Sequence, residues 1–198
     1  TAKVREAMLT FNLSQAGQHW IANSMAVLAA VHAAGGDLAS AGLALAEMGG
    51  LSGRGARHDV AVAGGSVHVI DESYNANPAS MAATIGQLGL SSSGRRIAVL
   101  GSMKELGEKS DHYHRALAAP LAAAKVDFAI LVGKEMEILA EELKAGVEGP
   151  KEFAHCATAQ EALALLQQYL CASDTILVKG SNSMGLSTIV SALTGGKN

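Results

Sequence analysis

The chain carries one polar stretch, Asp71-Glu72-Ser73-Tyr74-Asn75-Ala76-Asn77-Pro78, between a strand pattern and a helix pattern. Residues 67–70 before it are mostly apolar and β-branched, and apolar residues recur at helical spacing over 81–88. Asn77 suits the N-cap of that helix, and Pro78 suits its first position, where a missing N–H leaves no bond unmade. Ligands of open α/β sheets bind at the carboxyl ends of strands. The stretch is therefore a candidate binding loop, although an ordinary polar strand-to-helix loop has a similar composition.

On both sides of this loop, short apolar runs alternate with helical patterns. Strands are predicted at 60–62, 67–70, 97–100, 128–132, near 153 and at 175–178. Helices are predicted over 110–124, 136–143 and 159–170, and a last helix is predicted through Ile189 and Leu193. Gly64-Gly65 indicates a hairpin between the first two strands. The later runs are almost uniformly apolar, as in parallel strands that helices cover on both faces. The pattern predicts an α/β fold, with a Rossmann-like, doubly wound, mostly parallel sheet that has an antiparallel edge.

Residues 1 to about 50 show helical patterns and no strand pattern. Apolar residues spaced like Ile21, Met25 and Leu28 predict one helix, which Gly35-Gly36 should end. Asp37 suits the N-cap of a second helix that runs to Gly49-Gly50. A helical pair without a sheet is typical of the end of another domain, so the predicted domains are 1–52 and 53–198. Because the chain opens at Thr1, we expect it to be a piece of a longer protein.

Composition argues against several classes of protein. Among 198 residues, 49% are hydrophobic, which is ample for a core, and the net charge of −3 offers no electrostatic case for nucleic acid or an anionic membrane. No apolar run approaches the roughly 20 residues that span a bilayer. The motifs of nicotinamide and flavin sites, of the P-loop and of serine hydrolases are missing from the sequence. The seven histidines suggest no metal site. Cys156 and Cys171 have no disulfide or metal spacing, so both are expected to be small core residues in a reducing cytoplasm.

Three more polar segments follow predicted strands, at 101–108, 133–135 and 179–183. All should emerge at the same sheet edge as Glu72, so their side chains should converge there. Lys179 directly follows a buried strand, where lysine is seldom found without a partner. Lys104 and Glu105 have a simpler explanation as a solvated loop pair. His114 is expected to be a helix-surface or packing residue.

Taken together, these motifs resemble those of the Mur ligases. The resemblance rests on residues 71–81, on the segment from 97 to 107 with His114, on Leu177-Val178-Lys179-Gly180-Ser181, and on Gly17-Gln18-His19 with Asn23. Within the family it is closest to the members that add D-Ala-D-Ala to UDP-MurNAc-tripeptide in peptidoglycan synthesis. It implies an ATP-dependent acid–D-amino-acid ligase of the cytoplasm, which activates a carboxylate as an acyl phosphate and uses Mg²⁺.

The resemblance also implies roles for individual residues. Asn23 should lie beside the adenine of ATP, and Arg54 should reach the nucleotide. Glu72 matches the acidic residue that accepts the ribose hydroxyls, with Asp71 beside it. Tyr74 and Asn75 would shape the same pocket, while Lys179 and Ser181 would face the incoming dipeptide. Trp20, Ser102 and Asn182 depart from the residues usual in the family.

By the same resemblance, residues 1–52 are the helical end of the central ATP-binding domain, and 53–198 are the Rossmann-like C-terminal domain. The P-loop and the metal ligands of the family would lie before Thr1, so we expect the 198 residues alone to be inactive, with no catalytic residue and no metal ligand among them. Two alternatives stay open. One is another Mur or folylpolyglutamate-type ligase with a different amine substrate. The other is a non-catalytic nucleotide-binding module that uses the same fold.

Overall fold

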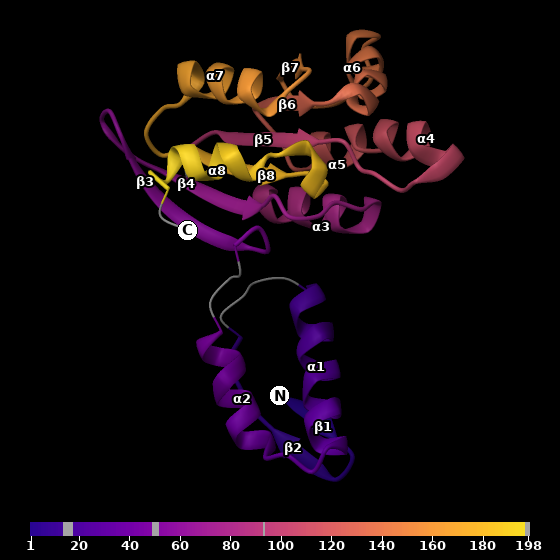
Figure 1. Cartoon of the computed structure of the whole chain (residues 1–198), viewed down its shortest axis with the longest axis vertical. Coiled ribbons are helices and arrows are strands. Elements are labelled where there is room, and N and C mark those ends of the chain that lie inside the picture. The colour runs from indigo at the N-terminus through magenta and orange to yellow at the C-terminus, as the bar shows by residue number, and fades with distance from the viewer. Residues whose placement is uncertain (14–17, 49–51, 93, 197–198) are drawn as a thin grey trace. The chain divides into compact units, whose positions relative to one another are not determined.

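The computed structural model describes residues 1–13, 18–48, 52–92 and 94–196. Contacts divide the chain into two compact units, Thr1–Gly50 and Leu51–Asn198 (Figure 1). The predicted stop at Gly49-Gly50 lies outside the described residues. Each unit has its own core and is described by itself.

The larger unit is built on a six-stranded sheet with the order β3-β4-β8-β5-β6-β7. Its strands are β3 (Ala56–Val62), β4 (Gly65–Glu72), β5 (Arg96–Gly101), β6 (Phe128–Val132), β7 (Glu152–Cys156) and β8 (Thr175–Lys179). Only the pairing of β3 with β4 is antiparallel; the other four pairings are parallel. The turn of the predicted hairpin is Ala63 and Gly64, the latter at φ 84°, and Gly65 begins β4 opposite Val62.

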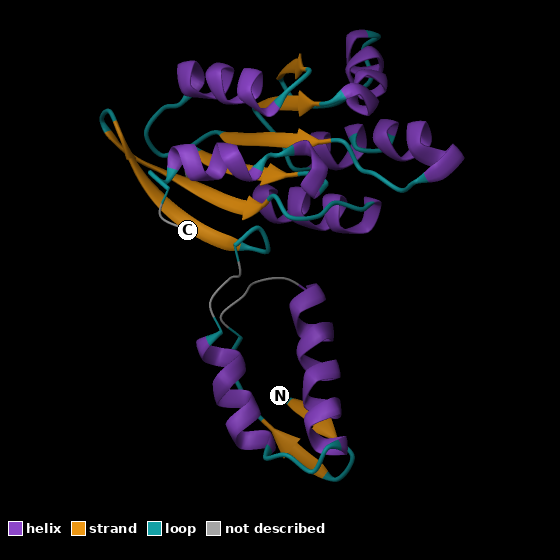
Figure 2. Cartoon of the chain, in the orientation of Figure 1, coloured by secondary structure: helices purple, strands orange, loops and turns teal. Residues whose placement is uncertain are grey.

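Helices cover both faces of this sheet (Figure 2). They are α3 (Pro78–Gly89), α4 (Ser110–Arg115), α5 (Ala118–Ala123), α6 (Glu137–Lys144), α7 (Ala159–Tyr169) and α8 (Ser187–Leu193). Successive residues of β5 show the two faces: Ala98 and Leu100 join the core with α3, α5 and α6, while Ile97 and Val99 join the core with α7 and α8. This two-sided burial explains the uniformly apolar strands and confirms the predicted fold class. No helix in the described ranges is long and apolar enough to cross a membrane.

One predicted helix is wrong in its extent. The 110–124 pattern forms two helices, α4 and α5, with a break at Ala116 and Leu117. Pro120 explains the break, because it has no N–H to donate to the carbonyl of Ala116 and its ring would clash with that carbonyl in a continuous helix. The break lets α5 pack separately against α3.

The smaller unit contains strands as well as helices, which corrects the expectation that residues 1–50 are all helical. β1 (Ala2–Val4) and β2 (Ala7–Leu9) form an antiparallel hairpin, followed by α1 (Gln18–Ala33) and α2 (Leu38–Glu47). Asp37 caps α2 as predicted, since its Oδ2 accepts the amide of Ser40 at 2.8 Å. Strands of three residues are too short to show a repeat of two, so the pattern could not reveal them.

The two cysteines differ in their surroundings. Cys156 is buried at the end of β7, and burial raises the pKa of its thiol. Cys171 is exposed in the loop after α7, so the expectation that it is a core residue is wrong. It lies in the loop around Asp174, whose Oδ2 accepts the Cys171 amide at 2.8 Å, and this turn keeps its side chain outside the core.

Candidate functional site

The stretch 71–78 forms the loop between β4 and α3, at the carboxyl edge of the sheet. Strand β4 lies next to β8 in the sheet, so Glu72 pairs in register with Lys179. On the other side of β8, Lys179 pairs with Leu100 of β5. Asn77 is the N-cap of α3: its Oδ1 accepts the Ser80 amide at 2.9 Å, and Ser80 Oγ accepts the Asn77 amide at 3.1 Å. With Pro78 at the first position, this capping box confirms the predicted start of the helix. The helix start therefore fixes the end of the loop.

Asp71 points into the protein and organises the loop from inside. It is 2% exposed, and its carboxylate accepts the Gly53 amide at 2.7 Å, the Ser73 amide at 3.1 Å and the Ser73 hydroxyl at 2.6 Å. A second pair of bonds joins the same segments, since the Tyr74 amide donates to the Gly53 carbonyl and the Gly55 amide donates to the Asp71 carbonyl. Asp71 therefore ties residues 53–55 to the end of β4.

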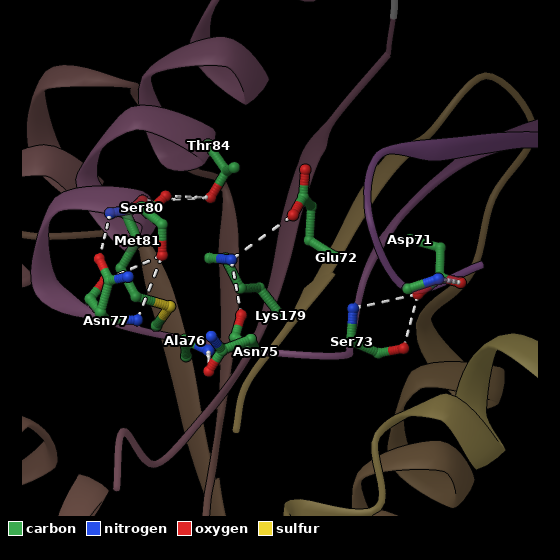
Figure 3. Close-up of polar contacts among 11 residues, drawn as sticks. Asp71, Glu72, Ser73, Asn75, Ala76, Asn77, Ser80, Met81, Thr84 and Lys179 are labelled. Atoms are coloured by element: carbon green, nitrogen blue, oxygen red, sulfur yellow. Dashed lines mark hydrogen bonds and ion pairs between the residues drawn. The ribbon is translucent and has the colours of Figure 1, made fainter. Parts of the chain in front are cut away.

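Glu72 points to the opposite side of the strand from Asp71. The buried ammonium of Lys179 contacts both Glu72 and Asn75, near the far end of the loop (Figure 3). Lys179 Nζ lies 3.5 Å from Glu72 Oε2 and donates to the Asn75 carbonyl at 2.9 Å. The Lys179 side chain is 2% exposed, and that of Glu72 is 15% exposed. Burial lowers the pKa of Lys179, and the Glu72 carboxylate partly offsets that effect. The predicted meeting of Glu72 and Lys179 at one edge of the sheet is thus confirmed.

Arg54 and Tyr74 form the exposed face of this cluster. The Arg54 guanidinium lies 4.3 Å from the centre of the Tyr74 ring, and both side chains are exposed. Gly53 allows the approach, because its φ is 73° and a Cβ there would lie 2.7 Å from Tyr74 Cβ. The face combines a cation and an aromatic ring, and Glu72, whose side chain is 15% exposed, precedes Tyr74 by two residues. Such a set can bind the hydroxyls and phosphates of a nucleotide.

A second group of polar side chains follows β5, β6 and β8. The Lys104 ammonium pairs with Glu135 rather than with Glu105, which corrects the expected solvated loop pair. This contact is the largest of the effects that lower the pKa of Glu135 to about 2. Ser181, which is buried, accepts the Lys104 amide at 2.9 Å through its hydroxyl. The three loops therefore converge here as well.

His114 has a role that the sequence pattern did not reveal. Its ring is fully buried; Nε2 accepts the Met103 amide at 2.9 Å, and Nδ1 lies 2.8 Å from the Ser110 carbonyl, to which it donates. Together with Ser181, it holds two successive amides of the 102–106 loop. A histidine at the fifth position of a helix that follows a polar loop was the available signal. The residue that it bonds could not be read from spacing.

The remaining predicted nucleotide residue lies in the smaller unit. Asn23 is exposed on α1 and lines a small pocket with Trp20, Val27 and Leu45. Gly17 lies outside the described residues, as do the side chains of Gln18 and His19. Within the described ranges, no three His, Cys, Asp or Glu side chains are grouped so that they could hold a metal ion.

The chain is similar in sequence and in fold to known ligases. Residues 54–182 match the family described as Mur ligase, glutamate ligase domain, and the chain belongs to the Mur ligase family. Over 98% of its length, it is 31% identical to the UDP-N-acetylmuramoyl-tripeptide–D-alanyl-D-alanine ligase of Mycobacterium leprae. It spans about two fifths of that relative, since 40% of the relative is covered. The predicted family is thereby confirmed.

Solved structures of similar proteins agree. MurF from Acinetobacter baumannii superposes with a TM-score of 0.74 at 28% identity, over 93% of this chain and 39% of that chain. MurF from Thermotoga maritima, solved in complex with ADP, superposes with a TM-score of 0.75 at 22% identity, over 95% of this chain and 41% of that chain. The second likeness shows the fold alone. The roles of individual residues, and the assignment of residues 1–52 to an ATP-binding domain, stay predictions.

Proposed function

We propose that the chain is the C-terminal part of an ATP-dependent ligase that joins D-Ala-D-Ala to UDP-MurNAc-tripeptide in the cytoplasm. The observation that carries the proposal is the exposed pair of Arg54 and Tyr74, together with the partly exposed Glu72, at the carboxyl edge of a Mur ligase domain. The identity to MurF-type relatives along nearly the whole chain supports the choice of substrates.

In the proposed reaction, the terminal carboxylate of the tripeptide attacks the γ-phosphorus of ATP, which gives an acyl phosphate and releases ADP. The amine of the dipeptide then attacks the acyl carbon, and the C–O bond to phosphate breaks as the amide forms. Mg²⁺ would neutralise charge on the phosphates, and its ligands are proposed to lie outside these 198 residues.

The proposed role of this chain in the reaction is to bind ATP and to exclude water from the site. Glu72 would accept the two ribose hydroxyls, Arg54 would reach the phosphates, and Tyr74 and Asn75 would wall the pocket. Asp71, whose carboxylate already accepts three bonds within the protein, would act by shaping the loop. In the smaller unit, Asn23 would contact adenine. Excluding water protects an acyl phosphate from hydrolysis and strengthens the charge interactions around it.

Ser181 would face the incoming dipeptide. Its oxygen accepts the Lys104 amide, which leaves the hydroxyl proton to donate to a ligand carboxylate. Lys179 is also a predicted dipeptide contact. Its contacts in the structure favour a different role.

The test is a ligation assay with the full-length gene product that carries these residues. We expect ATP-dependent formation of UDP-MurNAc-pentapeptide from UDP-MurNAc-tripeptide and D-Ala-D-Ala, and no turnover by the 198 residues alone. A panel of other amines separates the alternatives. Reaction with a different amine, and none with D-Ala-D-Ala, would indicate another ligase of the family. Lack of ATP-dependent ligation with every amine would indicate a non-catalytic binding module.

A further inference from the structure

Among the residues whose burial the structure describes, Lys179 is the largest that is fully buried, and a buried ammonium is costly without partners. Its nitrogen is already engaged by the protein on two sides, at 2.9 Å from the Asn75 carbonyl and 3.5 Å from Glu72 Oε2. The ammonium has a third N–H, but the side chain is 2% exposed, so a ligand at the open edge of the sheet could reach it only if the loop moved. The geometry therefore argues against a direct contact between Lys179 and an incoming anion.

The two partners of Lys179 lie at the two ends of the same short segment. Glu72 is the last residue of β4, and Asn75 lies two residues before the N-cap of α3. Lys179 ends β8, whose backbone pairs with β4 in parallel register, so its Cα is fixed beside that of Glu72. Figure 3 shows the ammonium between the Glu72 carboxylate and the Asn75 carbonyl. One side chain thus sets the distance between the start and the end of the loop.

We propose that Lys179 is a positioning residue for the nucleotide, which holds the Glu72 carboxylate and the 73–75 backbone in the arrangement that accepts the ribose. This inference rests on the proposed function, since it takes Glu72 as the ribose contact. Its chemistry is that of a shared cation: one N–H serves the carbonyl, and the charge restrains one carboxylate oxygen. The other Glu72 oxygen is left to accept hydroxyl groups.

The kinetic test uses the full-length gene product with Lys179→Met, which keeps the alkyl stem and removes the ammonium. We expect KM for ATP to rise about 10-fold while KM for D-Ala-D-Ala changes by less than about 2-fold. Lys134→Met is the matched control, because Lys134 is exposed at the end of β6. A loss of stability alone would lower activity without this split between the two KM values.

A double variant tests the coupling. With Glu72→Gln in place, adding Lys179→Met should raise KM for ATP by less than about 2-fold, because Lys179 acts through Glu72. Effects that multiply would overturn the proposal. So would a Lys179→Met variant whose KM rises for D-Ala-D-Ala and not for ATP, since that result means direct contact with the dipeptide.

Hydrogen–deuterium exchange separates this inference from the proposed function, because it needs no ligase activity. Amides of Ser73, Tyr74 and Ala76 are bonded within or beside the loop, so loosening it exposes them. Lys179→Met should speed exchange in peptides covering 72–77 and leave those covering 128–132 unchanged. Unchanged exchange at 72–77, or equal acceleration everywhere, would contradict the positioning role even in a protein that ligates nothing.

Discussion

Asp71 and Glu72 are adjacent carboxylates with opposite surroundings. Asp71 is 2% exposed and accepts three hydrogen bonds from the protein, whereas Glu72 is partly exposed and faces Lys179. The alternation of side chains along a strand accounts for the difference, because consecutive residues of β4 point to opposite sides. One carboxylate is thereby used for the loop itself, and the other is left for a ligand.

The role of Asp71 predicts a large effect on stability. Asp71→Asn should lower the free energy of unfolding by about 2 kcal/mol, because the amide puts N–H groups toward donors and removes charge from three bonds. Urea unfolding followed by circular dichroism measures this.

Asp59→Asn is the control on the neighbouring strand. The Asp59 side chain is 75% exposed and pairs with His68, which is itself 48% exposed, so its change should stay within about 0.5 kcal/mol. Equal effects of the two substitutions would show that the buried bonds of Asp71 do not hold the loop.

At the scale of elements, the loop between β5 and η1 (Gly107–Lys109) is held by side chains from three other places. His114 bonds the Met103 amide, Ser181 bonds the Lys104 amide, and Glu135 pairs with the Lys104 ammonium. Glu105 follows with φ 64°, a conformation that costs energy for a residue other than glycine. A strained turn held by so many partners is typical of a functional loop.

Two variants of His114 separate its acceptor from its donor. Gln can place an oxygen near Nε2 and accept the Met103 amide, while Asn can place an N–H near Nδ1 and donate to Ser110. We expect His114→Asn to destabilise the protein by about 2 kcal/mol and to speed exchange at Met103, with His114→Gln closer to wild type. If Asn is tolerated better than Gln, the bond to Ser110 is the important one.

The pair of Lys104 and Glu135 predicts a dependence of stability on pH. The pKa of Glu135 falls from 4.5 to about 2 on folding, so its contribution is present above pH 4.5 and disappears as the pH falls toward 2. The side chains are 41% and 32% exposed, so screening reduces the contribution to about 1 kcal/mol.

Lys104→Met should therefore lose less stability than wild type as the pH falls from 5 to 2.5, because most of the contribution of Glu135 disappears over that range. Urea unfolding at several pH values measures the difference, with Lys134→Met as the control. Parallel pH profiles for wild type and Lys104→Met would show that the pair does not set the pKa of Glu135.

The sequence pattern predicted the sheet well because its strands are buried on both faces, as the runs 97–100 and 175–178 show. It also brought Glu72 and Lys179 together, since parallel neighbouring strands end at one edge. It could not identify partners that depend on packing, such as Glu135 for Lys104 or Met103 for His114. It also missed β1 and β2, whose three-residue lengths show no period.

At the scale of the whole molecule, the chain is two units with separate cores. The larger one is the Mur ligase domain, and its proposed nucleotide contacts are the exposed pair of Arg54 and Tyr74 and the partly exposed Glu72. The central claim is that Glu72 accepts the ribose hydroxyls of ATP. A charged hydrogen bond of this kind contributes about 1.5–3 kcal/mol, which is enough to measure by changing either partner.

The most direct test compares ATP with 2′,3′-dideoxy-ATP as substrates of the full-length gene product, in wild type and in Glu72→Ala. The account predicts that wild type prefers ATP by about 10-fold or more in kcat/KM, and that the preference falls to within about 2-fold in Glu72→Ala. The KM for UDP-MurNAc-tripeptide should stay close to that of wild type. A preference for ATP that is as large in Glu72→Ala as in wild type would contradict the claim.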